Sequence, residues 1–216
     1  MIGCPGFKES LGGNKIGAVV IYTRSSIDDP PRQITYPAEG FGTSLSVNAG
    51  GILAIGSKIG SVILVNLSNT IPDLLLTSTL GNGFYITDVA LNDNIPPLLA
   101  VGAIKEAGDR SGSVFLYTDI TNTDAVPVEI SAPPAANCGS GCLFGFSVAL
   151  FDRTLVVGSP GTGNSAGRAF VYDLDQENFA QKVQSLPASP PTNALFGSSV
   201  AIADGAVVVG SPNYSR

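Results

Sequence analysis

The stretch FGFSVALFDRTLVVGSPGTGNSAGRAFVYDL, residues 144–174, decides the fold, because a shortened copy, FGSSVAIADGAVVVGSP, starts again at Phe196. Two further segments follow the same order of an aromatic residue, an apolar run and a glycine: FGTSLSVNAGGILAIGSK from Phe41 and YITDVALNDNIPPLLAVGA from Tyr85. Apolar runs of this kind end in glycine at Gly3, Gly56, Gly102, Gly158 and Gly210. The chain therefore repeats itself with a period of about fifty residues.

Each period is predicted to hold four short strands. SVALF and TLVVG are apolar runs bounded by turn residues, and RAFVYDL follows a glycine-rich loop, with Phe170 and Tyr172 on one face and Ala169 and Val171 on the other. A less regular fourth strand comes next, such as QKVQSLP from Gln181. Four strands in a period of about fifty residues indicate an all-β chain, a β-propeller of four-stranded antiparallel blades. The predicted single domain, 1–216, divides into a half-blade 1–40, blades 41–84, 85–143 and 144–195, and a half-blade 196–216.

The motif carries a family resemblance. Phe-Gly-x-Ser-Val-Ala, an apolar strand ending in Gly-Ser-Pro, and then Gly-x-Ala-x-Val-Tyr resemble the FG-GAP repeat of the β-propeller in integrin α subunits and in many bacterial and algal surface proteins. The match covers nearly the whole chain and is fullest in residues 144–172 and 196–212. In this interpretation Phe144 and Phe196 pack between neighbouring blades, and the glycines after them allow a close backbone approach or a positive φ.

Composition excludes several classes of protein. Only 13% of the residues are charged, the net charge is −6, and the chain has 26 Gly and 15 Pro, which suit short strands and tight turns rather than long helices. No basic run is present for nucleic acid, and no apolar stretch is long enough for a membrane-spanning helix. The start, MIGCPGFKES, lacks the features of a signal peptide, and we expect its first Met to have been added to a mature or trimmed chain.

The sequence favours a protein without catalytic activity. It has no His and no Trp, which excludes a Ser-His-Asp triad, a Cys-His pair and a zinc site with imidazole ligands. A hydrolase with two carboxylates stays an alternative. However, Asp28 with Asp29, and Asp173 with Asp175, lie in predicted turns, where solvated acidic residues are common. No catalytic residue, cofactor or metal ligand is therefore assigned.

Several relatives in the FG-GAP family carry a calcium loop between the first two strands of a blade. The corresponding segment here, ALNDNIPPL, offers Asn92 and Asn94, but Ala90 and Leu98 stand where the outer carboxylates belong. We expect a solvated turn and folding that does not need calcium. The loops KEAGDRSG from Lys105 and GTGNSAG from Gly161 are further candidates for a binding face, or simply long solvated turns.

Cys138 and Cys142 flank a Gly-Ser-Gly turn that could bring their side chains together, so we expect a disulfide, with two free thiols as the alternative. Two sequons, at Asn66 and Asn213, are candidate glycosylation sites. Both features fit an extracellular or cell-surface protein.

The function expected from the resemblance is extracellular recognition or adhesion, with a protein or glycan as the partner. A structural subunit of a cell-surface or filamentous assembly is the first alternative. Unpaired strand edges at the two half-blades also suggest self-association. We expect the strand Ile16 to Tyr22 and the strand Ala206 to Gly210 to share one sheet, within one chain or between two. This leaves three arrangements: a four-bladed ring from one chain, an eight-bladed ring from two chains that exchange halves, or a piece of a larger propeller, which the seven blades usual in the family favour.

Overall fold

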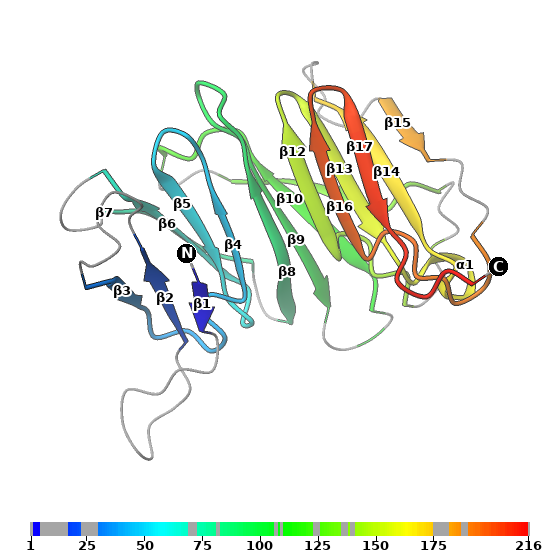
Figure 1. Cartoon of the computed structure of the whole chain (residues 1–216), viewed down its shortest axis with the longest axis horizontal. Coiled ribbons are helices and arrows are strands. Elements are labelled where there is room, and N and C mark those ends of the chain that lie inside the picture. Colours follow the sequence, from blue (N-terminus) through cyan, green and yellow to red (C-terminus); the bar gives the residue numbers. More distant parts are fainter. Residues whose placement is uncertain are drawn as a thin grey trace, which may run out of the picture.

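The computed structural model is an all-β arrangement of five antiparallel sheets that follow one another along the sequence (Figure 1). It describes residues 2–4, 17–22, 30–68, 73–80, 83–105, 108, 110–122, 126–134, 138, 141–174, 182–186 and 190–215. The one helix among them, α1 (Thr162–Ser165), is a four-residue turn. Within these residues no helix is long and apolar enough to cross a membrane.

The three middle sheets each contain four consecutive strands joined as a meander. The second sheet comprises β4 (Ser44–Val47), β5 (Ile52–Gly56), β6 (Ser61–Asn66) and β7 (Asp73–Thr79). The third comprises β8 (Phe84–Leu91), β9 (Leu99–Lys105), β10 (Gly112–Tyr117) and β11 (Val128–Ser131). The fourth comprises β12 (Ser147–Phe151), β13 (Thr154–Ser159), β14 (Arg168–Asp173) and β15 (Lys182–Ser185).

The two end sheets are smaller. The first sheet contains β1 (Ile2–Cys4), β2 (Ala18–Ile21) and β3 (Arg32–Thr35), and the fifth contains β16 (Ser199–Ala203) and β17 (Ala206–Gly210). The predicted boundary between residues 84 and 85 falls at the first residue of β8, because Phe84 already pairs with Lys105 of β9.

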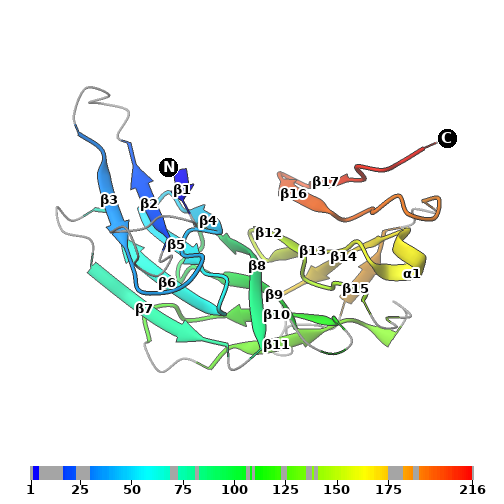
Figure 2. The same cartoon turned by 90° about the horizontal axis from the view of Figure 1, so that it is seen from below.

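The core lies between successive sheets, because alternate residues of each strand face opposite neighbours. In β13, Leu155 and Val157 belong to the apolar cluster shared with the third sheet, while Val156 faces the other side. Separate apolar clusters fill the spaces between the first and second, the second and third, and the third and fourth sheets. Figure 2 shows the result as an arc of sheets, with the first at one end and the fifth at the other.

Phe144 shows how the repeated aromatic residue is used. Its ring is fully buried and lies 5.7 Å from the ring of Phe170, inside the cluster between the third and fourth sheets. The next residue, Gly145, has a φ of 85°, and its carbonyl oxygen lies where a side chain on Gly102 of the third sheet would be. Both glycines therefore allow a close backbone approach between sheets.

The expectation that the terminal strands share one sheet is wrong for a single chain. Residues 17–22 contribute β2 to the first sheet, whereas Ala206 to Gly210 form β17, which pairs with β16 in a separate sheet. In Figures 1 and 2 these sheets lie at opposite ends of the arc. The physical reason is that each sheet packs on the next in sequence order, so the first and fifth sheets of one chain stay at the two ends of the series.

Candidate functional site

The turns between the first and second strands of the sheets lie along one edge of the arc, the upper edge in Figure 1, which we call the turn edge. It includes residues 48–51 between β4 and β5, residues 92–98 between β8 and β9, and residues 152–153 between β12 and β13. The 92–98 segment is the longest of these three, and it contains the residues compared with a calcium loop.

Asn92 anchors this segment to the fourth sheet. Its side-chain oxygen accepts the backbone N–H of Leu98 at 2.7 Å, and its side-chain amide donates to the carbonyl oxygen of Asp152 at 2.7 Å. Asn94 donates its side-chain amide to the same carbonyl oxygen at 2.9 Å. These two side chains therefore join the third sheet to the next turn along the edge.

Asp93 and Asn48 anchor the same segment to the second sheet. One carboxylate oxygen of Asp93 accepts the backbone N–H of Ala49 at 2.6 Å, and the side-chain amide of Asn48 donates to the carbonyl oxygen of Asn92 at 3.2 Å. The polar residues of the segment thus bridge three successive sheets. No group of three or more metal-ligating side chains occurs in the described part of the chain.

A cleft of about 320 Å³ opens beside this bridged segment, and we call it the loop cleft. Its lining consists of Asn94, Ile95, Pro96, Leu98, Thr118 and Arg153. The Ile95 side chain is 99% exposed although it is held on a hydrogen-bonded segment, whereas Leu98 is buried below it. The cleft therefore combines an apolar surface with an amide, a hydroxyl and a guanidinium group, which are groups that bind polar partners.

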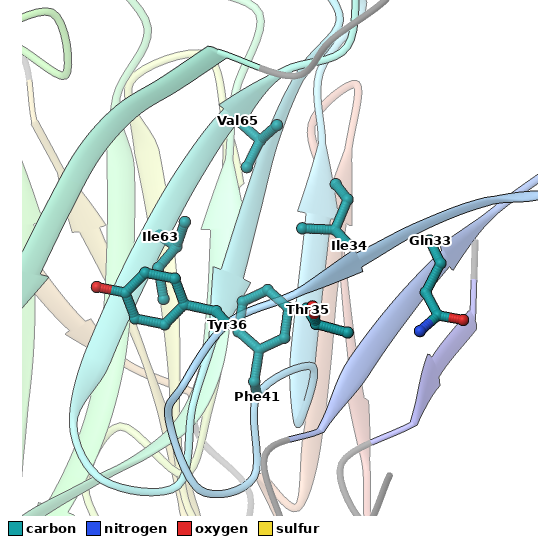
Figure 3. Close-up of a pocket in the computed structure, with 7 residues that line it drawn as sticks. All are labelled: Gln33, Ile34, Thr35, Tyr36, Phe41, Ile63 and Val65. Atoms are coloured by element: carbon teal, nitrogen blue, oxygen red, sulfur yellow. The ribbon is translucent and has the colours of Figure 1, made fainter. Parts of the chain in front are cut away.

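A second hollow, of about 370 Å³, lies between β3 and β6. Figure 3 shows the rings of Tyr36 and Phe41 near Ile63, with Ile34 and Val65 farther along the same strands. Phe41 and Ile63 are buried, so the floor of this hollow is apolar.

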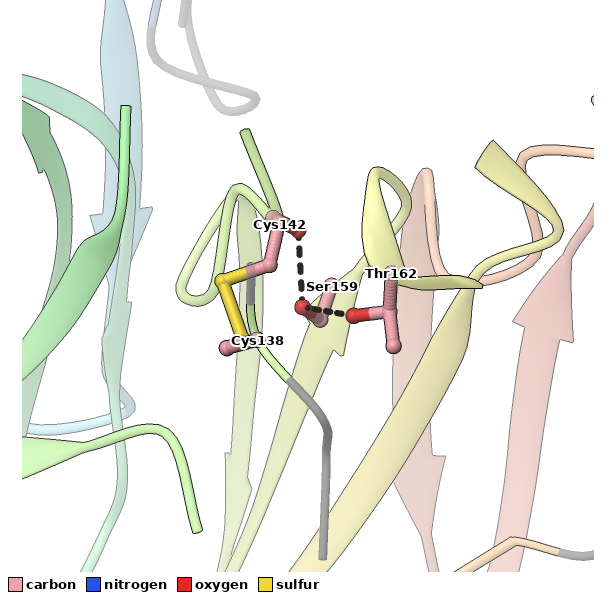
Figure 4. Close-up of a disulfide and its surroundings, with 4 residues drawn as sticks. All are labelled: Cys138, Cys142, Ser159 and Thr162. Atoms are coloured by element: carbon pink, nitrogen blue, oxygen red, sulfur yellow. Dashed lines mark hydrogen bonds between the residues drawn. A yellow bond between two sulfur atoms is a disulfide. The ribbon is translucent and has the colours of Figure 1, made fainter. Parts of the chain in front are cut away.

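The structure joins Cys138 and Cys142 in a disulfide with their Cα atoms 5.3 Å apart (Figure 4). The carbonyl oxygen of Cys142 accepts the hydroxyl of Ser159 at 2.8 Å and the N–H of Gly161 at 3.1 Å, and Ser159 also bonds Thr162. Because the crosslinked turn is held against the end of β13, these groups have a structural role.

The loop from Gly161 is occupied by contacts with the segment that leads into β16. The carbonyl oxygens of Ser165 and Ala166 accept the backbone N–H groups of Leu195 and Phe196. In the loop from Lys105, the Lys105 ammonium lies 5.6 Å from the centre of the Phe84 ring, and its backbone N–H donates to Ser111. None of the described residues of these two loops lines the loop cleft.

Asp88 is a carboxylate at the contact between the third and fourth sheets. It lies in an irregular part of β8, where its two oxygens accept the backbone N–H groups of Val89 and Val148, each at 3.0 Å. Burial raises the pKa of this carboxyl, although both hydrogen bonds act in the opposite direction. The adjacent Thr87 donates its hydroxyl to the carbonyl oxygen of Gly145 at 2.7 Å. This pair of residues therefore fastens the third sheet to the fourth.

The remaining predicted residues are dispersed. Asn213 is exposed, while Asn66 is partly buried at the end of β6 and accepts the N–H of Ser68. Asp173 lies at the end of β14, and Asp28, Asp29 and Asp175 fall outside the described residues. Sequence reasoning missed Ile95 and Arg153, since an isoleucine beside two prolines and an arginine in a two-residue turn carry no distinguishing pattern.

No family model and no curated protein matches the chain. Among solved structures, the chain is similar to the computationally designed Ika4 protein, with 15% sequence identity and a TM-score of 0.47. That similarity covers 80% of this chain and 86% of the designed one.

Proposed function

We propose that the chain is a β-propeller module of the FG-GAP type, without catalytic activity, that recognises an extracellular protein or glycan through the turn edge. The propeller proposal is supported by three consecutive four-stranded meanders with separate apolar clusters between them. The sequence motif supplies the resemblance to the FG-GAP repeat.

The observation that carries the recognition proposal is the exposed side chain of Ile95 on a segment held by Asn92, Asp93 and Asn94. A large apolar side chain that is both exposed and held in place can be buried by a partner at little cost in conformational entropy. The neighbouring Arg153 and Asn94 supply polar groups that fix the orientation of the partner. This combination favours a protein surface more than a purely polar glycan.

The disulfide between Cys138 and Cys142 and the exposed Asn213 support an extracellular location. Disulfides persist in oxidising compartments, and an exposed sequon is accessible for glycosylation. Expression in a secreting eukaryotic host, with and without a glycosidase, would test modification at Asn213.

The test of recognition is a binding screen of the folded protein against arrays of extracellular proteins and of glycans. For a partner that binds through the loop cleft, we expect Ile95→Asp and Arg153→Ala each to weaken binding by about tenfold or more, the factor for about 1.4 kcal/mol. The matched control is Ile59→Asp, an exposed residue in the turn between β5 and β6, at the opposite edge of the sheets. Partners whose affinity does not change in the two cleft variants would exclude the loop cleft as the recognition site.

A structural role in a cell-surface assembly is the second candidate function. It is favoured by the exposed apolar face of the fifth sheet, where Val208 is 65% exposed. Such a face is suited to contact with another protein chain.

A further inference from the structure

The fifth sheet exposes a position that is buried in every four-stranded sheet. Val208 precedes Gly210 by two residues, as Ala54, Ala100 and Val156 precede Gly56, Gly102 and Gly158. The three equivalent side chains are each 0% exposed, and Ala54 and Ala100 belong to the clusters shared with the next sheet, whereas Val208 is 65% exposed. The free face of β16 and β17 therefore has the character of an interface between sheets.

The first sheet also has an incompletely buried residue, on its face that is turned away from the second sheet. Val20 in β2 is only partly buried. Val20 lies three residues after Gly17, and the equivalent residues three positions after Gly60, Gly112 and Gly167 are Ile63, Phe115 and Phe170. All three of these are buried. In the second to fourth sheets, these residues face the preceding sheet. The first sheet thus offers a face on which a preceding sheet would pack.

The strand β17 contains a glycine that corresponds to Gly3 of β1 in the strand register. In the four-stranded sheets, the repeated glycine of the second strand (Gly56, Gly102 or Gly158) lies opposite Val62, Val114 or Ala169 in the third strand. In the first sheet, Gly3 of β1 occupies this position, opposite Val19 of β2. Gly210 of β17 is the remaining glycine of this series, so β17 fits beside β2 in the register that β1 now has.

The fifth sheet is also attached to the fourth in the way that the second is attached to the first. Gly167 and Phe196 form a parallel bridge between the fourth and fifth sheets, and Gly17 and Phe41 form the same bridge between the first and second. A sheet that combined β16 and β17 with β2 and β3 would therefore continue the existing series of contacts in both directions.

The two end sheets of one chain do not lie where they could combine. Figure 2 shows the first sheet extending to the left of the arc and the fifth to the right, in opposite directions. A second arc, related to the first by a two-fold axis, would bring the fifth sheet of each copy to the first sheet of the other. A second copy of the chain is therefore the occupant that suits both free faces.

We propose that two copies pair reciprocally, each inserting β16 and β17 beside β2 of its partner in place of β1. This proposal rests on the proposed propeller fold, because it extends the repeat across the pair into a closed ring. In the combined sheet Val208 lies beside Ile21 of the partner subunit and faces the partner's second sheet. β2, β16 and β17 contain no charged residue, so the contact buries no ionised side chain.

The first test is the mass of the purified protein by size exclusion with light scattering over a range of concentrations. We expect a pair with twice the 22.0 kDa mass of one chain. Val208→Asp places a charge on the face that the partner buries and is expected to return the mass to 22.0 kDa. The control Ile59→Asp should leave the pair intact. A monomer at all concentrations, a growing polymer, or a pair that tolerates Val208→Asp would overturn the proposal.

The second test is a disulfide between positions 208 and 21, introduced as Val208→Cys with Ile21→Cys in a Cys4→Ser background. In the combined sheet these residues are direct neighbours on adjacent strands, so oxidation should link two chains covalently. A crosslink within one chain would mean that the arc closes on itself, and the absence of any crosslink would mean that the strands do not meet. Both results contradict reciprocal pairing. Neither bears on the loop cleft, because a monomer that binds a partner through Ile95 would still support recognition.

Discussion

Replacement of Gly102 by alanine tests the contact between the third and fourth sheets. Gly102 lies in β9, where an added Cβ would be 2.1 Å from the carbonyl oxygen of Gly145. Gly145 is itself fixed, because its N–H donates to Gly158 at 3.0 Å and its carbonyl oxygen accepts the Thr87 hydroxyl at 2.7 Å. The methyl group therefore cannot be accommodated without separating the two sheets.

The expected cost follows from three contributions. Overpacking in a fixed core costs about 1–3 kcal/mol. Displacement of the Gly145 carbonyl weakens the bond from Thr87, for a further cost of about 1 kcal/mol. The lower entropy of the unfolded chain with alanine offsets about 0.4–1 kcal/mol. We expect Gly102→Ala to lower the free energy of unfolding by about 2 kcal/mol.

Urea unfolding followed by circular dichroism measures this difference. At a slope of about 2 kcal/mol/M, the midpoint should fall by about 1 M. The matched control is Gly50→Ala in the turn between β4 and β5, where the closest atom to an added Cβ is 3.3 Å away. Equal midpoints for the two variants would refute the close approach of the third and fourth sheets.

Four further outcomes are expected. Burial raises the pKa of Asp88, so its contribution favours folding most below its ordinary value of 3.8 and is lost as the pH rises through the folded-state pKa. Asp88→Asn should therefore flatten the decline in the free energy of unfolding above about pH 4, and an unchanged slope would contradict this. Asn92→Ala should lower stability by about 2 kcal/mol through its lost bonds to Asp152 and Leu98. A metal chelator should leave the melting temperature of the native protein unchanged, and a marked drop would reveal a metal site. Cys138→Ser should lower stability by up to about 2 kcal/mol, as closure of a short loop implies, whereas a melting temperature equal to that of the oxidised protein would contradict it.

The strands could be predicted from the sequence because burial on two faces imposes a regular pattern. Leu155, Val156 and Val157 form an apolar run whose alternate residues face the two neighbouring sheets, as expected for a strand covered on both sides. The repeated glycines then set the register. The pattern does not state which strand occupies a given edge. Gly3 in β1 and Gly210 in β17 hold the same position in the repeat, and it is the structure that pairs β1 with β2.

The bridges along the turn edge could not be predicted because their partners are backbone groups. The sequence pattern of the 92–98 segment predicts a solvated turn, whereas Asn92 and Asp93 bond the carbonyl oxygen of Asp152 and the N–H of Ala49 in the turns of two other sheets. Nearly every residue has the same backbone donor and acceptor, so the sequence does not reveal which of them a side chain will bond. The exposure of Ile95 was hidden for a related reason, since isoleucine is among the residues most often found in cores.

A crystal structure of the purified protein would test the central claim, that these repeats build a β-propeller, most directly. We expect successive sheets to surround one common axis, with β17 beside β2 of a second copy and the loop cleft open on one face of the ring. Sheets that are stacked without a common axis, or a β17 edge left open to solvent in the assembled protein, would contradict the account.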